Sequence, residues 1–139
     1  MNVKTSNKPP VWFWIVSVIA LIWNGFGVDG YLGQAYNTER YRNSFTPEQL
    51  DITASLPSWL TAAFAIAVFA GVLGSLGLLL RKKWANFLLI LSLIAVILQM
   101  GYILIQGHLD NIGMTISIII FSLFLVWFSK KSLTKGWIL

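Results

Sequence analysis

The sequence predicts an all-helical integral membrane protein, a bundle of four transmembrane helices with both chain termini in the cytoplasm. Three observations support this fold class. The composition is 57% hydrophobic and only 11% charged, whereas about a quarter of the residues of a soluble domain are charged. The apolar residues form four long blocks rather than amphipathic stripes. Most of the basic residues lie at one side of those blocks.

The four blocks cover residues 11–28, 58–80, 84–106 and 111–128, and none of them contains Lys, Arg, Asp or Glu. Each is close to the ~20 residues that a helix needs to cross a ~30 Å hydrocarbon core. Because lipid offers the backbone no hydrogen-bonding partner, each block is expected to be a helix. We therefore predict one transmembrane domain over residues 1–139.

The charges indicate the orientation. The turn between the second and third blocks contains Arg81, Lys82 and Lys83. The same side holds the lysines that precede the first block and follow the fourth: Lys4, Lys8, Lys130, Lys131 and Lys135. The opposite side holds every acidic residue: Asp29, Glu39, Glu48, Asp51 and Asp110. By the positive-inside rule the basic side is cytoplasmic, and its turn is expected to meet anionic lipid headgroups rather than nucleic acid.

The outer loop, residues 29–57, is expected to contain a short helix. Its start is marked by Thr46, Pro47 and Gln49, which fit an N-cap, a first helical position and a capping-box partner. We predict a helix over about 47–54. The polar stretch before it is compatible with an extension of the first helix beyond the membrane, and Ser58 is expected to cap the second helix.

The second block has a face of small residues. Ala63, Ala67, Gly71 and Ser75 recur every four positions, and Gly74 lies on the adjoining row. Small residues let helix backbones approach closely in lipid. This face is expected to pack against the chain's own helices, with a homodimer interface as the alternative.

The first and third blocks resemble each other. Setting Ser17 on Ser92 places Asn24 on Gln99, and the ends of the second and fourth blocks match when Arg81 is set on Ser129. This similarity favours two duplicated helical hairpins related by an axis along the membrane normal.

Asn24 and Gln99 are the main polar candidates. At 1.5 Å per residue, both lie roughly 20 Å from the cytoplasmic edge. They are expected to form an interhelical hydrogen bond or the floor of a pocket that is open to the outside. The pocket would be ringed by further polar side chains: Tyr102, Gln106, Tyr31, Gln34 and Asp29.

Other chemistry is disfavoured. The chain has no cysteine, which excludes thiol chemistry. His108 and Asp110 are too few for a metal site, and Asp110 fits the N-cap of the fourth helix better. No catalytic arrangement or intramembrane acid is evident. We expect no metal, no cofactor and no enzymatic activity.

Several stretches resemble a family of small bacterial four-span membrane proteins. They are KPPVWFWIVSV at 8–18, ALIWN at 20–24, TAAFAIAVF at 61–69 and LLRKKWA at 79–85. The resemblance implies a multi-pass protein of the bacterial inner membrane. Some members carry an automatic "sugar transporter" label, and the family offers no established functional residues to carry over.

Two functions remain open. One is a structural or accessory protein that associates with itself or with a larger membrane complex through the small-residue face and the outer segment. The other is a small oligomeric transporter or binder of a neutral polar solute such as a sugar. Four helices enclose little space, so the second function was expected to require association.

Overall fold

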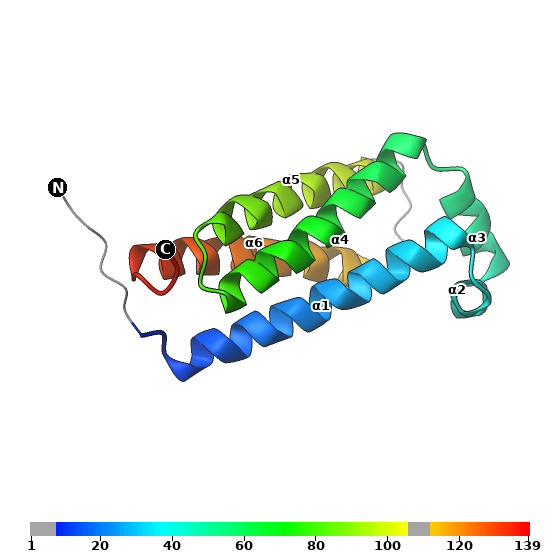
Figure 1. Cartoon of the computed structure of the whole chain (residues 1–139). Helices are drawn as coiled ribbons and strands as arrows, with labels where there is room; N and C mark the ends of the chain where they lie inside the picture. The colour runs from blue at the N-terminus through cyan, green and yellow to red at the C-terminus, as the bar shows by residue number, and fades with distance from the viewer. Residues whose placement is uncertain (1–7, 106–111) are drawn as a thin grey trace.

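The computed structural model describes residues 8–105 and 112–139, and this part of the chain consists of helices without strands. The long helices are α1 (Val11–Tyr36), α4 (Ser58–Leu79), α5 (Trp84–Ile105) and α6 (Ile112–Thr134). Two short helices, α2 (Glu39–Ser44) and α3 (Pro47–Ala54), lie between α1 and α4 (Figure 1). Within these described ranges, four helices are long and apolar enough to cross a membrane. The fold is therefore the predicted four-helix bundle of a multi-pass membrane protein.

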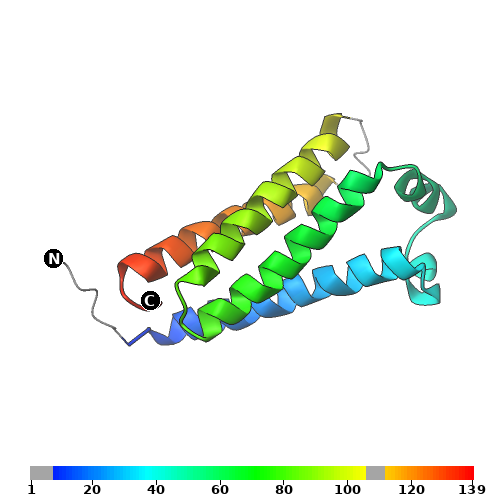
Figure 2. The same ribbon diagram turned by 45° about the horizontal axis from the view of Figure 1, so that its top comes forward.

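The long helices pack in chain order, α1 on α4, α4 on α5 and α5 on α6. Figure 2 shows them running along one another, with α2 and α3 at the end opposite the start of α1 and the end of α6. We call the end that carries Lys8, the turn 81–83 and the lysines of α6 the basic end. The end that carries α2 and α3 is the acidic end. Between α1 and α6 the backbones do not pack extensively in the described chain.

Two helices run past their apolar blocks, and for α1 this agrees with the expected extension beyond the membrane. Helix α1 continues beyond Val28 to Tyr36, where Asn37 adopts a left-handed conformation with φ 52° and donates its backbone N–H to Gly33 O. Helix α6 continues past Phe128 to Thr134 because its final polar turns keep the helical hydrogen bonding. Helix α2 was not predicted from the sequence.

The acidic end confirms one capping prediction and corrects another. Helix α3 spans the predicted residues, and Thr46 and Gln49 form the expected capping box. Ser58 does not cap α4. Pro57 is the N-cap residue, no side chain caps this end, and Ser58 is the first helical residue.

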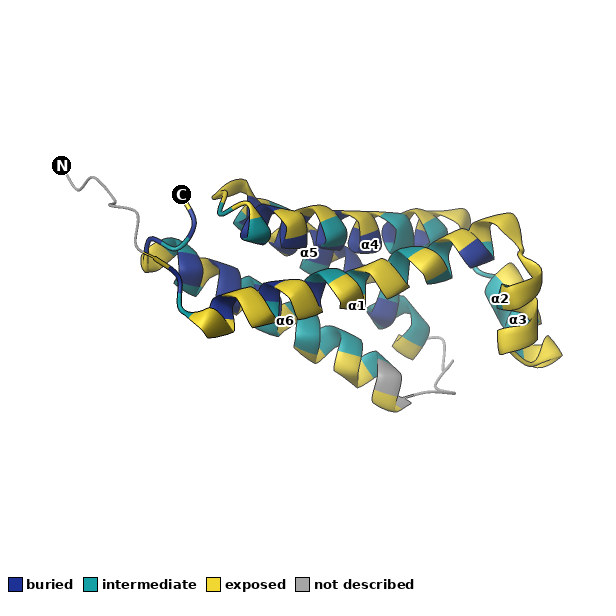
Figure 3. Ribbon diagram, turned by 60° about the horizontal axis from the view of Figure 1, so that its bottom comes forward, coloured by how far each residue is buried: buried dark blue, intermediate teal, exposed yellow. Residues whose placement is uncertain are grey.

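The burial pattern fits a protein surrounded by lipid. Many large apolar residues are exposed. Figure 3 shows exposed positions running along the outward faces of the helices. Phe26 is 71% exposed and Phe87 67% exposed, an arrangement that would be costly in water and favourable against lipid tails. At the basic end the core is formed by large side chains, including Phe13, Phe128 and Ile138. Toward the acidic end it is made by smaller ones around Ala67, Ala95 and Val96.

The segment after α6 folds back onto the basic end. Gly136 has φ 78°, a left-handed conformation that glycine adopts without strain. The backbone N–H groups of Trp137 and Ile138 then donate to Ser132 O. Leu139 exchanges backbone hydrogen bonds with the α4–α5 turn, accepting from Lys83 N–H and donating to Arg81 O. The returning segment thereby ties α6 to the turn between α4 and α5.

Candidate functional site: a cavity between the four helices

The small-residue face of α4 is buried inside the chain, as the first alternative predicted. Ala63, Ala67, Gly71, Gly74 and Ser75 are all buried. A Cβ added at Gly71 would lie 2.1 Å from Asn24 Oδ1 on α1, and one added at Gly74 would lie 2.8 Å from Leu89 Cγ on α5. The glycines therefore allow α1 and α5 to approach α4 from two sides.

Asn24 forms its interhelical hydrogen bond with α4. Its Nδ2 donates to Ala20 O at 2.9 Å and to Ser75 Oγ at 3.4 Å, while Ser75 Oγ donates to Gly71 O at 2.7 Å. No hydrogen bond joins Asn24 to Gln99 in the described structure. The carboxamide thus belongs to the α1–α4 contact.

Ser92 makes the corresponding contact between α5 and α4. Its hydroxyl donates to the backbone carbonyl of Ala67 at 2.6 Å, and the side chain is only 6% exposed. A side-chain bond to a carbonyl of another helix requires close backbones, which Ala67 permits. Ser92 contributes to the sequence prediction only through the alignment of the repeat, and the spacing of Ser92 along the chain gives no signal of this bond.

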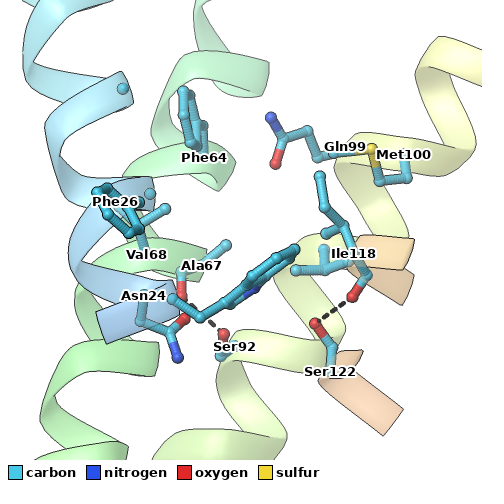
Figure 4. A pocket seen from close by; sticks show the side chains of 14 residues that line it. Asn24, Phe26, Phe64, Ala67, Val68, Ser92, Gln99, Met100, Ile118 and Ser122 are labelled. Carbon is cyan, nitrogen blue, oxygen red and sulfur yellow. Dashed lines mark hydrogen bonds between the residues drawn. The ribbon is translucent and has the colours of Figure 1, made fainter. Parts of the chain in front are cut away.

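A cavity of about 460 Å³ lies among α1, α4, α5 and α6. Binding pockets for small molecules commonly have volumes of about 300–1,000 Å³. The hydroxyls and carboxamides in its lining come from Asn24, Ser92, Gln99 and Ser122 (Figure 4). The rest of the lining is aromatic, aliphatic or glycine, and none of the described lining residues is charged. The cavity therefore suits a neutral molecule.

Gln99 is the carboxamide of the lining that makes no hydrogen bond within the described chain. It is half-buried, and its carboxamide has no hydrogen-bond partner among the described residues. Figure 4 shows the carboxamide extending from α5 toward Phe64 on α4, with Asn24 coming from α1. A carboxamide offers two donors and an acceptor, so Gln99 can donate a hydrogen bond to a hydroxyl oxygen and accept one from a hydroxyl hydrogen.

The other described members of the predicted ring do not line this cavity. Tyr102 packs edge-to-face against Trp59, with ring centroids 5.3 Å apart. Tyr31 contacts Phe64 and Phe69 in the same way, at 5.7 Å each.

Two further members of the predicted ring lie nearer the acidic end. Asp29 accepts a hydrogen bond from Arg40 of α2 and lines a separate cavity of about 280 Å³. Gln34 is half-buried farther along α1.

Three residues considered in the sequence analysis, Gln106, His108 and Asp110, lie outside the described residues. Neither the expected place of Gln106 in the ring nor the expected cap at Asp110 is addressed by the structure.

The basic turn divides into two parts. Lys82 and Lys83 are exposed, whereas Arg81 is half-buried and its Nε donates to Trp137 O at 2.8 Å. Contact with lipid headgroups stays a prediction for all three residues. Lys131, which was not singled out, lies over the rings of Trp12 and Trp127 at 5.5 and 5.1 Å.

The fold and the cavity define a class: a multi-pass four-helix membrane bundle with an uncharged cavity inside it. Comparison with protein-family models, curated protein sequences and solved structures found no match. The resemblance to small bacterial four-span proteins therefore stays a prediction.

Proposed function

We propose that this chain is a non-enzymatic membrane protein that binds a small neutral molecule in the cavity between its four long helices. The observation that carries the proposal is a cavity of about 460 Å³ with an uncharged lining and, at its wall, a carboxamide without a hydrogen-bond partner among the described residues. The carboxamide of this half-buried side chain stays accessible, because no buried polar side-chain atom of the described residues lacks a partner, so a ligand in the cavity can gain affinity from a hydrogen bond to Gln99. The expected location is the bacterial inner membrane, with the basic end in the cytoplasm.

The depth of the cavity supports binding within the membrane. Its α1 wall runs from Trp23 to Gly30, roughly 18 to 29 Å from the start of the helix at 1.5 Å per residue. That stretch lies in the half of the hydrocarbon core nearer the acidic end. The ligand site is thus away from both chain termini.

Association through the small-residue face has less support. The side chains of that face contact α1 and α5 of the same chain, so a second copy would have to open the bundle to reach them. Association with another copy or a larger complex through other surfaces remains a prediction, and the cavity does not require it.

A pair of glycines on α1 offers a matched test. Gly30 lines the cavity, and a Cβ added there would meet only Phe64 Cζ, at 3.8 Å. A Cβ at Gly25 would meet nothing within 4 Å, and Gly25 is exposed. Gly30→Leu should therefore fill the cavity, while Gly25→Leu places the same side chain against lipid.

The measurement is an inventory of small molecules that co-purify with the protein from its membrane, made by mass spectrometry after extraction. We expect a neutral compound that is retained by the parent and by Gly25→Leu and reduced at least about tenfold in Gly30→Leu. Identical inventories for all three proteins would contradict the proposal.

A further inference from the structure

We propose that the molecule in the cavity is a neutral amphiphile of the bilayer, with an apolar body and one hydroxyl, which enters between α1 and α6 and hydrogen-bonds to Gln99. The inference rests on the proposed function and specifies both the ligand class and the route of entry. Three observations support it. Helices α1 and α6 pack less closely than α4 and α5, the α1 wall of the cavity is exposed, and most polar groups of the lining already donate hydrogen bonds within the chain.

The two contacts between the hairpins, α4 with α5 and α1 with α6, differ in how closely the helices pack. If α1 and α4 corresponded to α5 and α6 by a two-fold axis, the contact of α6 with α1 would match the contact of α4 with α5. In the structure α4 packs closely on α5, whereas the α1 and α6 backbones do not pack extensively. Setting Arg81 on Ser129 explains the difference, because Gly74 and Gly77 of α4 then correspond to Ser122 and Leu125 of α6.

Those glycines are what bring α5 close to α4. A Cβ at Gly74 would lie 2.8 Å from Leu89 Cγ, and one at Gly77 would lie 2.7 Å from Trp84 Cζ3. Leu125, at the position that corresponds to Gly77, is too large to allow the same approach of α6 to α1. The side of the cavity between α1 and α6 is therefore the side without a small-residue interface.

The same comparison explains the unused carboxamide. In the first hairpin, Asn24 donates to Ser75. In the predicted alignment of the repeat, Asn24 corresponds to Gln99 and Ser75 corresponds to Leu123, and a leucine side chain offers no acceptor. Gln99 thus occupies the position of a structural carboxamide without the hydroxyl that would engage it, and its hydrogen-bonding groups remain available to a ligand.

The α1 wall of the cavity reaches the outer surface of the bundle. Phe26 lines the cavity and is 71% exposed, and Trp23 lines it and is 37% exposed. Trp23 also contacts Phe121 of α6, with ring centroids 5.0 Å apart. Because these residues lie within the length of α1 that crosses the hydrocarbon core, the surface beside them faces lipid tails. A molecule dissolved in the bilayer reaches this side without passing through water.

The polar groups of the lining limit how many hydroxyls a ligand can carry. The hydroxyls of Ser92 and Ser122 already donate to Ala67 O and Ile118 O, and the Asn24 amide already donates to Ser75. Apart from Gln99 and the Trp23 indole N–H, the polar groups of the lining offer a ligand acceptors only. A sugar would therefore leave several hydroxyls without a donor against apolar side chains, which is unfavourable. A single hydroxyl can accept from the Gln99 amide and donate to its carbonyl, leaving the rest of the ligand to the apolar lining.

The test uses a photoreactive alcohol in phosphatidylcholine liposomes that contain the protein. The probe is hexadecan-1-ol with a diazirine in its chain and an alkyne at its end, and labelled peptides are identified by mass spectrometry. Hexadecan-1-ol, hexadecane and glucose serve as competitors. The parent is compared with Gln99→Leu, with Gly30→Leu and with the lipid-facing control Gly25→Leu.

We expect labelling of α1 around residues 23–30 and of α6 around 118–122 in the parent and in Gly25→Leu, and its loss in Gly30→Leu. Hexadecan-1-ol should compete at about five- to tenfold lower concentration than hexadecane, the effect of one hydrogen bond on affinity. Gln99→Leu should keep the labelling and remove this preference. Glucose should not compete.

The alternative results separate this inference from the proposed function. Equal competition by hexadecane and hexadecan-1-ol in the parent would overturn the role of Gln99 and of the hydroxyl. Protection of the cavity by glucose alone would overturn the amphiphile and leave a solute-binding cavity in place. Absence of cavity labelling, together with identical co-purified molecules in the parent and Gly30→Leu, would remove both proposals. The competition arm uses only the parent protein, so it is decisive even if a variant fails to insert.

Discussion

Replacing Gly71 with alanine should loosen the contact between α1 and α4. The new Cβ would lie 2.1 Å from Asn24 Oδ1 and 2.6 Å from Asn24 Cγ, distances far below van der Waals contact. Asn24 cannot move aside freely, because its Nδ2 is held by Ala20 O and Ser75 Oγ. The substitution therefore forces either the hydrogen bond to Ser75 or the helix spacing to change.

The expected size follows from three contributions. Overpacking of a close contact costs about 1–3 kcal/mol, and the lost interhelical hydrogen bond adds about 1 kcal/mol. The higher helix propensity of alanine returns up to about 1 kcal/mol. The net destabilisation should therefore be about 1–3 kcal/mol.

The assay is unfolding by sodium dodecyl sulfate in mixed micelles, followed by circular dichroism. Gly101→Ala is the matched control, since a Cβ at Gly101 would meet nothing within 4 Å; that variant should be as stable as the parent or slightly more so. Combining Gly71→Ala with Asn24→Ala should recover about 1 kcal/mol or more through the removed clash. Equal stability of Gly71→Ala and Gly101→Ala would refute the reasoning.

Two further predictions concern the ends of the bundle. Ile138 is 1% exposed and Leu139 is 40% exposed. In the same unfolding assay, Ile138→Ala should lower the free energy of unfolding by about 2 kcal/mol or more, and Leu139→Ala should lower it by about 0.5 kcal/mol. Equal losses would argue against a docked C-terminal segment. Because the chain has no cysteine, a single introduced cysteine reports the orientation of its position in cells. A membrane-impermeant maleimide should label Glu48→Cys in intact cells, and Lys135→Cys only after permeabilisation. The reverse pattern would invert the predicted topology.

The membrane-spanning helices were predictable because lipid imposes a simple rule on length and composition. The blocks beginning at Val11, Ser58 and Trp84 start where the helices start, since each is preceded by charge or proline. The end of α6 was missed, and the expected extension of α1 had no defined end, for a common reason. Hydropathy marks where the apolar run stops, whereas a helix continues through polar residues such as Gln34 and Ser132 until a cap ends it.

The site was predictable only in part. Carboxamides in the apolar blocks pointed to Asn24 and Gln99, and both line the cavity. The hydrogen-bond partner of each carboxamide depends on how the helices pack. The spacing of residues along the sequence does not specify that packing. The aromatic contacts of Tyr31 and Tyr102 show the same limit, because a tyrosine near a helix end serves a packed ring pair as readily as a polar pocket.

The most direct test of the central claim is an experimental structure of the protein in a lipid nanodisc prepared from its native membrane. The account predicts density for an elongated molecule between α1 and α6, ending within hydrogen-bond distance of the Gln99 carboxamide, and no such density in Gly30→Leu. Helices α1 and α6 closed against each other, with Gln99 hydrogen-bonded to α6 and no room for a ligand, would contradict it.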